Sequence, residues 1–278
     1  MSTSRIDARF AALKAEGRAG FVAYVMAGDP DYATGLAILK GLPGAGADLI
    51  EVGFPFSDPM AEGPPIQRAA LRALGEGMTL SKTLEMIAEF RQGDQTTPII
   101  LMGYANPLVS RGFEAFAREA AAAGVDGLIV VDIPPEEAGP LADALDAAQV
   151  SLIRLATPTT DDERMTVVVR RTSGFVYYVS VAGVTGVKEA DAAVVAPHVT
   201  RVRKASGLPV AVGFGIKTPE RAAAIARVAD AVVVGSALVD EVALAAELNE
   251  DVTSRVLSKV ESLSKAVRSA RVGQTTTV

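Results

Sequence analysis

The feature that most constrains the fold is one pattern of alternating segments that recurs along the whole chain. A short β-branched run is followed by a loop and then by an alanine-rich helical segment with its charges on one face. Alternation of this kind predicts a parallel sheet covered by helices. Eight such strand and helix pairs in one uninterrupted chain favour closure into a (β/α)8 barrel, although an open doubly wound sheet has the same local pattern.

The expected strands are the β-branched runs at residues 21–26, 48–53, 99–102, 127–131, 151–155, 175–179, 209–213 and 231–234. Helical patterns separate them at residues 31–42, 78–91, 112–123, 135–148, 161–171, 190–206, 218–227 and about 250–269. Ile6, Phe10 and Leu13 are spaced like one face of a further helix, which we expect to cap the bottom of the barrel. Since no connecting segment is long or polar enough to be a domain linker, we expect residues 1–278 to form a single barrel domain.

Composition narrows the function classes. The chain has no cysteine, which excludes disulfides, thiolate catalysis and cysteine metal sites and agrees with a cytoplasmic location. The formal net charge of −6, together with the lack of any window where basic and aromatic residues cluster, argues against nucleic-acid binding. No apolar run reaches the roughly 18 to 20 residues that cross a bilayer, and the N-terminal segment lacks the apolar core of a signal peptide. We therefore expect a soluble protein that binds neither membrane nor metal.

Two carboxylates stand out in the segment ADLIEVGFPFSDPMAEGPP at residues 47–65. Glu51 lies in a strand that is apolar on both faces, so its carboxyl carries a desolvation penalty unless it is paired or shifted in pKa. The following loop is rich in Pro and Phe and carries Asp58 and Glu62, a composition that suits a stiff lid. In a barrel, Glu51 would lie near the C-terminal ends of the strands, where active groups gather.

The last third of the chain carries a second signal, in the glycine-rich loops AGVTG at 182–186, GFGIKTPE at 213–220 and GSAL at 235–238. Glycine lets backbone N–H groups approach an anion closely, and a helix N-terminus adds the positive end of its dipole. Many barrels bind phosphate after strands seven and eight, beside a short extra helix. The three loops together predict a phosphate site here, one that does not require a lysine.

These motifs resemble the tryptophan synthase alpha subunit family over nearly the full length of the chain. The resemblance is carried by FVAYVMAGDP, LIEVGFPFSDPMAEGPPIQRA, LMGYANP, GLIVVDIPPEE, VYYVSVAGVTG, VAVGFGIKTPE and VVVGSALV. It implies a (β/α)8 barrel and a lyase that splits indole-3-glycerol phosphate into indole and glyceraldehyde 3-phosphate without a cofactor. It also implies an α2β2 heterotetramer, in which the partner beta subunit holds pyridoxal phosphate and receives the indole.

The resemblance also assigns roles to residues. Glu51 matches the family's catalytic glutamate, a proton shuttle, and Glu62 matches a second carboxylate that accepts the indole N–H and stabilises positive charge on the ring. Tyr177 is expected to touch the indole and Thr185 to belong to a loop that closes over the substrate, while backbone amides hold the phosphate. The full set of expected substrate contacts is Tyr177, Thr185, Gly186, Phe214, Gly215, Gly235 and Ser236.

Glu62 departs from the family pattern, which usually has aspartate at this place. The extra methylene changes the reach of the carboxylate, and a displacement of about 1 Å can cost roughly 100-fold in rate. Three hypotheses follow: an alpha subunit stimulated by its beta subunit, a stand-alone indole-3-glycerol phosphate lyase, and a regulatory subunit whose catalysis is weakened by Glu62. Kinetics with and without a beta subunit separate the first two, and Glu62→Asp tests the third. Asp58 is an alternative second carboxylate.

Overall fold

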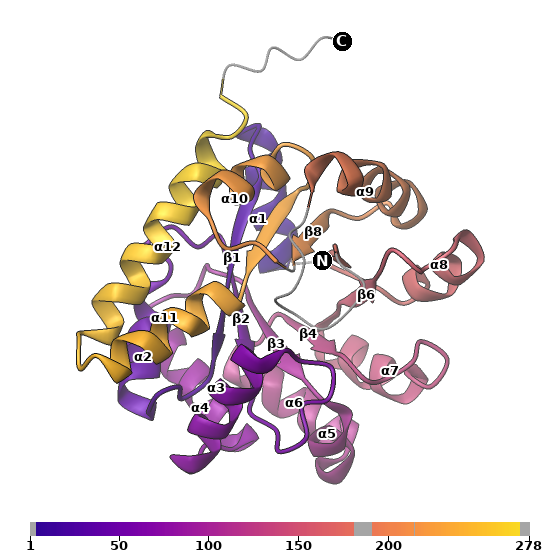
Figure 1. Ribbon diagram of the computed structural model, residues 1–278. Helices are drawn as coiled ribbons and strands as arrows, with labels where there is room; N and C mark the ends of the chain where they lie inside the picture. Colours follow the sequence, from indigo (N-terminus) through magenta and orange to yellow (C-terminus); the bar gives the residue numbers. More distant parts are fainter. Residues whose placement is uncertain (1–3, 181–190, 214, 273–278) are drawn as a thin grey trace.

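The computed structural model, which describes residues 4–180, 191–213 and 215–272, has nine parallel strands within those ranges, ringed by helices (Figure 1). The strands are hydrogen-bonded in the order β5-β4-β3-β2-β1-β9-β8-β7-β6. Their bounds are β1 (Gly20–Met26), β2 (Leu49–Gly53), β3 (Ile99–Gly103), β4 (Gly127–Val130), β5 (Ser151–Leu152), β6 (Arg154–Ala156), β7 (Val176–Val179), β8 (Val210–Gly213) and β9 (Ala231–Val234).

The two strands at the ends of this order, β5 and β6, are consecutive in the chain and are separated only by Ile153. The Ile153 N–H donates to the carbonyl oxygen of Leu128 on β4 at 2.9 Å, so the chain keeps its contact with β4 across the interruption. The predicted strand at 151–155 is therefore one interrupted strand that carries both ends of the sheet. This closes the sheet and confirms the (β/α)8 barrel over the open doubly wound alternative.

The helices that surround the strands are more numerous than the sequence patterns suggested. Their bounds are α1 (Arg5–Ala15), α2 (Tyr32–Gly41), α3 (Pro64–Gly75), α4 (Leu80–Arg91), α5 (Ala105–Arg111), α6 (Phe113–Ala123), α7 (Gly139–Ala148), α8 (Asp162–Val169), α9 (Ala192–Ser206), α10 (Pro219–Ala226), α11 (Ser236–Glu247) and α12 (Val252–Ser269). None of the helices in the part of the chain described here has the length and apolar character to span a membrane.

The sequence patterns predicted no helix at α3 or α5 and only a short one at α11. The paired prolines Pro64 and Pro65 make the start of α3 resemble a stiff loop. They fit the first turn of a helix, because the N–H groups there have no partner inside the helix. A buried face that includes Ile66 and Ala73 then holds the helix against the barrel.

Helix α1 caps the bottom of the barrel, as predicted. Its buried side chains Ile6 and Leu13 approach glycines at the starts of two strands. A Cβ added to Gly20 on β1 would lie 2.8 Å from Leu13 Cδ1, and one added to Gly127 on β4 would lie 3.2 Å from Ile6 Cδ1. The helix therefore packs closely across the N-terminal ends of the strands, which leaves the opposite end for the site.

Three aspartates at that lower end tie neighbouring strands together. Each carboxylate accepts a hydrogen bond from a backbone N–H of the adjacent strand or the residue that begins it: Phe21 to Asp48 at 3.0 Å, Ile99 to Asp126 at 2.8 Å and Val210 to Asp230 at 2.8 Å. Asp126 also pairs with Arg91, whose Nη2 lies 2.7 Å from Oδ2, and both side chains are buried. Such bonds hold the strand register that brings the upper ends of β1 and β2 level, with Tyr24 opposite Glu51.

Candidate active site

Glu51 lies on β2 with its side chain in the interior and only 2 % of its surface exposed. Its Oε2 atom is buried and has no hydrogen-bond partner among the described residues. Burial raises the pKa of the Glu51 carboxyl to about 8, and the negative charge of Glu62 contributes in the same direction. A carboxyl in this state holds a proton at neutral pH and is poised to exchange it.

Glu62 enters the same pocket from the loop between β2 and α3. Burial raises the pKa of its carboxyl to about 7. The loop is fixed on both sides of this residue, because the Ala61 N–H donates to the Tyr104 hydroxyl at 3.0 Å and Gln67 Nε2 donates to the Glu62 carbonyl at 2.9 Å. Asp58, the alternative second carboxylate, is exposed and does not line the pocket.

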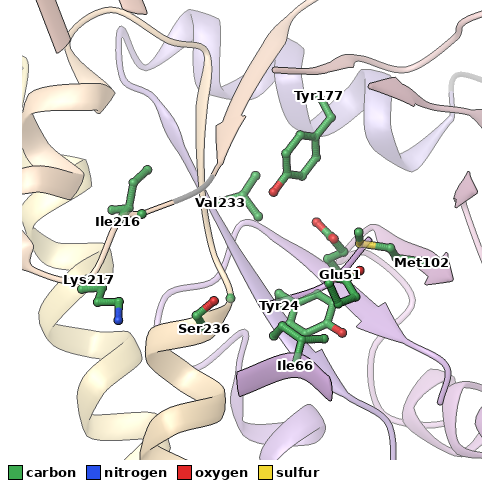
Figure 2. Close-up of a pocket in the computed structure, with 12 residues that line it drawn as sticks. Tyr24, Glu51, Ile66, Met102, Tyr177, Ile216, Lys217, Val233 and Ser236 are labelled. Carbon is green, nitrogen blue, oxygen red and sulfur yellow. The ribbon is translucent and has the colours of Figure 1, made fainter. Parts of the chain in front are cut away.

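Two tyrosines flank the carboxylates. Figure 2 shows the Tyr177 ring on β7 with its hydroxyl directed toward the Glu51 carboxyl, and Tyr24 on β1 below it. Burial, then the charges of the two glutamates, raise the pKa of both phenols well above the ordinary value, so each hydroxyl keeps its proton. Room for these hydroxyls comes from glycines, since a Cβ at Gly53 would overlap the Tyr24 hydroxyl and one at Gly213 would overlap that of Tyr177.

The other side of the pocket is built from the loops predicted to bind phosphate. Gly215, Gly235 and Ser236 line it, and α11 begins at Ser236 with Gly235 as its N-cap residue. Gly215 has φ +71°, a left-handed conformation that favours glycine. Because the first N–H groups of a helix have no partner within it, the start of α11 offers donors and a partial positive charge to an anion.

The structure thus brings together Glu51, Glu62, Tyr177, Gly215, Gly235 and Ser236 around one pocket of about 560 Å³, its open mouth included. Three other expected contacts, Thr185, Gly186 and Phe214, lie outside the described residues. A buried acid beside a second carboxylate, opposite a cluster of backbone donors, suits proton transfer on a substrate that carries an anionic group.

Part of the lining was not among the expected substrate contacts, namely Tyr24, Ile66, Met102, Ile216, Lys217 and Val233. A signal existed for Tyr24, an aromatic residue near the end of the first apolar strand, and for Lys217, which lies within the predicted phosphate loop at 213–220. No comparable signal marks Ile66, because its helix begins in a segment that resembles a loop. In the described part of the chain, no group of three or more His, Cys, Asp or Glu side chains gathers in a way that could hold a metal ion.

Comparison with known proteins agrees with this geometry. The sequence model of the tryptophan synthase alpha chain family matches residues 10–268. The chain is 79 % identical over 271 residues to a tryptophan synthase alpha chain of Phenylobacterium zucineum (strain HLK1), covering 98 % of each sequence. It is 74 % identical over 273 residues to one of Caulobacter vibrioides (strain NA1000 / CB15N), covering 98 % of this chain and 99 % of the relative.

Solved structures show the same likeness. The crystal structure of tryptophan synthase subunit alpha from Legionella pneumophila str. Paris superposes with a TM-score of 0.90 at 40 % identity, covering 96 % of this chain and 99 % of that one. A structure of Mycobacterium tuberculosis tryptophan synthase superposes with a TM-score of 0.85 at 36 % identity, covering 96 % and 99 %. The chain therefore belongs to the tryptophan synthase alpha chain family and is a subunit of an enzyme of tryptophan biosynthesis.

Proposed function

We propose that this chain cleaves indole-3-glycerol phosphate to indole and glyceraldehyde 3-phosphate, with Glu51 as the proton shuttle. The observation that carries the proposal is the buried Glu51 carboxyl, unpartnered at Oε2 among the described residues and with a pKa of about 8, which shares a pocket with a second carboxylate. A group with a pKa near the working pH is effective both as an acid and as a base.

Cleavage of the bond between the indole ring and the glycerol chain requires two proton movements. Protonated Glu51 donates a proton to the ring carbon that carries the chain, which leaves positive charge on the ring and a carboxylate on the enzyme. The carboxylate then takes the proton of the hydroxyl on the adjacent chain carbon. As that hydroxyl becomes an aldehyde, the electrons of the broken carbon–carbon bond return to the ring, indole leaves, and Glu51 is again protonated.

Glu62 supplies the complementary charge. As a carboxylate it accepts the indole N–H and stabilises the positive charge that the ring acquires on protonation. Burial raises the pKa of both carboxyls, and the pKa of Glu51 is raised further because Glu51 lies deeper in the barrel and faces the charge of Glu62. The difference between the two carboxyls gives each its own role, with Glu51 as the acid and Glu62 as the charged acceptor.

The substrate's phosphate is assigned to the backbone donors around Gly215, Gly235 and Ser236, and its indole to the space beside Tyr177. Thr185, Gly186 and Phe214 complete the proposed set of contacts. Because breaking the carbon–carbon bond needs from the enzyme only proton transfer and charge stabilisation, which carboxyl groups supply, we propose that the alpha chain works without a cofactor. Pyridoxal phosphate is assigned to the partner beta subunit, which would receive the indole within an α2β2 heterotetramer in the cytoplasm.

The test is indole release from indole-3-glycerol phosphate by the purified chain, with and without a beta subunit. An alpha subunit shows weak turnover alone and stimulation by the partner, whereas a stand-alone lyase turns over fully without it. A regulatory subunit releases no appreciable indole but still activates the beta subunit. Absence of indole in the presence of a beta subunit would exclude the proposed reaction.

A further inference from the structure

One side chain of the pocket has no part in the function proposed so far. Lys217 is the one basic residue among the described residues that line the pocket. It lies between Gly215 and the start of α10, and Figure 2 shows it on the same side of the pocket as Ser236, away from Glu51 and Tyr177. An ammonium group is thus carried at the end of the pocket to which the phosphate is assigned.

The ammonium is held only loosely. Its nearest acid is Asp240 on α11, whose Oδ2 lies 3.9 Å from Lys217 Nζ, beyond hydrogen-bond distance. The two side chains are 48 % and 42 % exposed, and an ion pair of this kind contributes little because solvent screens it. The lysine side chain is flexible, so its charge is available to a stronger anion that enters the pocket.

Asp240 has a position that makes it a competitor for that charge. It lies four residues after Ser236 on the same helix and therefore on the same face, one turn from the helix start. Its other carboxylate oxygen, Oδ1, lies 4.0 Å from Nη2 of Arg68 on α3. Asp240 thus stands between two cations and weakens the field that either one offers to a ligand.

The charge balance of the pocket indicates that Lys217 has a role in phosphate binding. A phosphate dianion must enter a site that also contains the Glu62 carboxylate, and a nearby charge of like sign opposes its entry. Backbone amides supply only partial charges, whereas an ammonium supplies a full one. We propose that Lys217 is a specificity-determining residue that selects the phosphorylated substrate by pairing with its phosphate, and that Asp240 limits the strength of this pairing. This inference deepens the proposed function and rests on it.

The test compares indole-3-glycerol phosphate with unphosphorylated indole-3-glycerol as substrates of the alpha chain in complex with its beta subunit. For Lys217→Ser we expect KM for the phosphorylated substrate to rise about tenfold, the effect of losing one charge-assisted bond, with kcat changed less than about twofold. The kinetics with indole-3-glycerol should stay unchanged. Lys204→Ser, which removes the same charge from an exposed site near the end of α9, is the matched control and should leave both substrates unaffected.

Asp240→Asn provides the opposite change. It should lower KM for the phosphorylated substrate by about two- to threefold. This gain should vanish in the Asp240→Asn, Lys217→Ser double variant, because Asp240 affects the phosphate only by weakening the charge of Lys217. An unchanged KM in Lys217→Ser would overturn the inference. So would an equal loss with both substrates, which would indicate a structural role for the lysine.

A binding measurement distinguishes failure of the proposed reaction from failure of the role proposed for Lys217. Calorimetric titration of the wild-type chain and of Lys217→Ser with glycerol 3-phosphate measures anion binding without any turnover. If no indole is released but the dissociation constant rises about tenfold in Lys217→Ser, the proposed function fails while the anion-binding role of Lys217 stands. An equal dissociation constant for the two proteins would overturn that role whatever the reaction.

Discussion

The negative charge of Glu62 raises the pKa of the Glu51 carboxyl beyond the effect of burial alone. Glu51 is fixed on a central strand and Glu62 on the loop that follows it, so the two groups are coupled through the pocket that both line. The coupling lets a change at one carboxyl be detected in the titration of the other.

Removing the charge of Glu62 should move the pH profile of the enzyme. In Glu62→Gln, like-charge repulsion is lost, so the pKa of Glu51 falls below about 8 and the protonated form is lost at a lower pH. We expect the basic limb of the kcat/KM profile for the residual activity to shift to lower pH. Asp58→Asn, in the exposed part of the same loop, is the control and should leave that limb in place. A basic limb that stays fixed in Glu62→Gln would contradict the coupling.

The buried acid should also cost stability in a defined pH range. Because folding raises the pKa of Glu51 from 4.5 to about 8, native Glu51 stays protonated while the unfolded chain ionises, and stability falls as the pH rises between these values. Each pH unit across that range lowers the free energy of unfolding by roughly 1 kcal/mol. Glu51→Gln removes this loss, so its Tm should match wild type near pH 4 and exceed it at pH 8.

Thermal unfolding across that pH range measures the difference. Glu137→Gln makes the same chemical change on the exposed surface and is the matched control. A gap between Glu51→Gln and wild type that does not widen with pH would mean that Glu51 is ionised in the native protein.

Glu62→Asp tests whether the longer side chain is adapted to its place. Both flanks of Glu62 are anchored, by Tyr104 on one side and Gln67 on the other, so the loop offers little freedom to carry a shorter carboxylate inward. We expect kcat for indole release to fall about tenfold, because a misplacement of this kind is costly in catalysis. A large gain in kcat would instead support the hypothesis of a weakened regulatory subunit.

The aspartates at the bottom of the barrel should dominate its stability. Asp126→Ala removes the acceptor of the Ile99 N–H and leaves buried Arg91 without its carboxylate, so the free energy of unfolding should fall by about 3 to 5 kcal/mol. Urea denaturation measures this loss. Asp143→Ala removes one of the two carboxylate partners of Arg171, in a pair whose aspartate is 73 % exposed, and should leave stability close to that of wild type. Similar losses in the two variants would contradict the importance of burial.

The barrel could be predicted because its strands are apolar on both faces and its helices repeat, features that a sequence displays directly. The interruption at Ile153 could not be predicted, because it arises where one run of chain pairs with β4 through β5 and with β7 through β6. Helix α3 could not be predicted either, because Pro64 and Pro65 suit both a stiff loop and a first helical turn, and only packing of the following residues decides between them.

In the candidate site, too, some features could be predicted from the sequence and others could not. Glu51 was evident as a charge in an apolar strand, and the glycines of the late loops marked the anion-binding end. The part played by Tyr24 depends on its register opposite Glu51 and on the space left by Gly53, neither of which the sequence displays. Lys217 lies within the predicted loop at 213–220, but the sequence does not display whether its side chain lines the pocket.

The central claim is that the buried carboxyl of Glu51 transfers the proton that breaks the substrate's carbon–carbon bond. The direct measurement is the rate of indole release from indole-3-glycerol phosphate by wild type and by Glu51→Gln, each saturated with a beta subunit. The glutamine side chain has nearly the same shape as glutamate but cannot exchange a proton in this way, so the account predicts a loss of at least about 100-fold in kcat. Retention of wild-type kcat in Glu51→Gln, with substrate still bound, would contradict it.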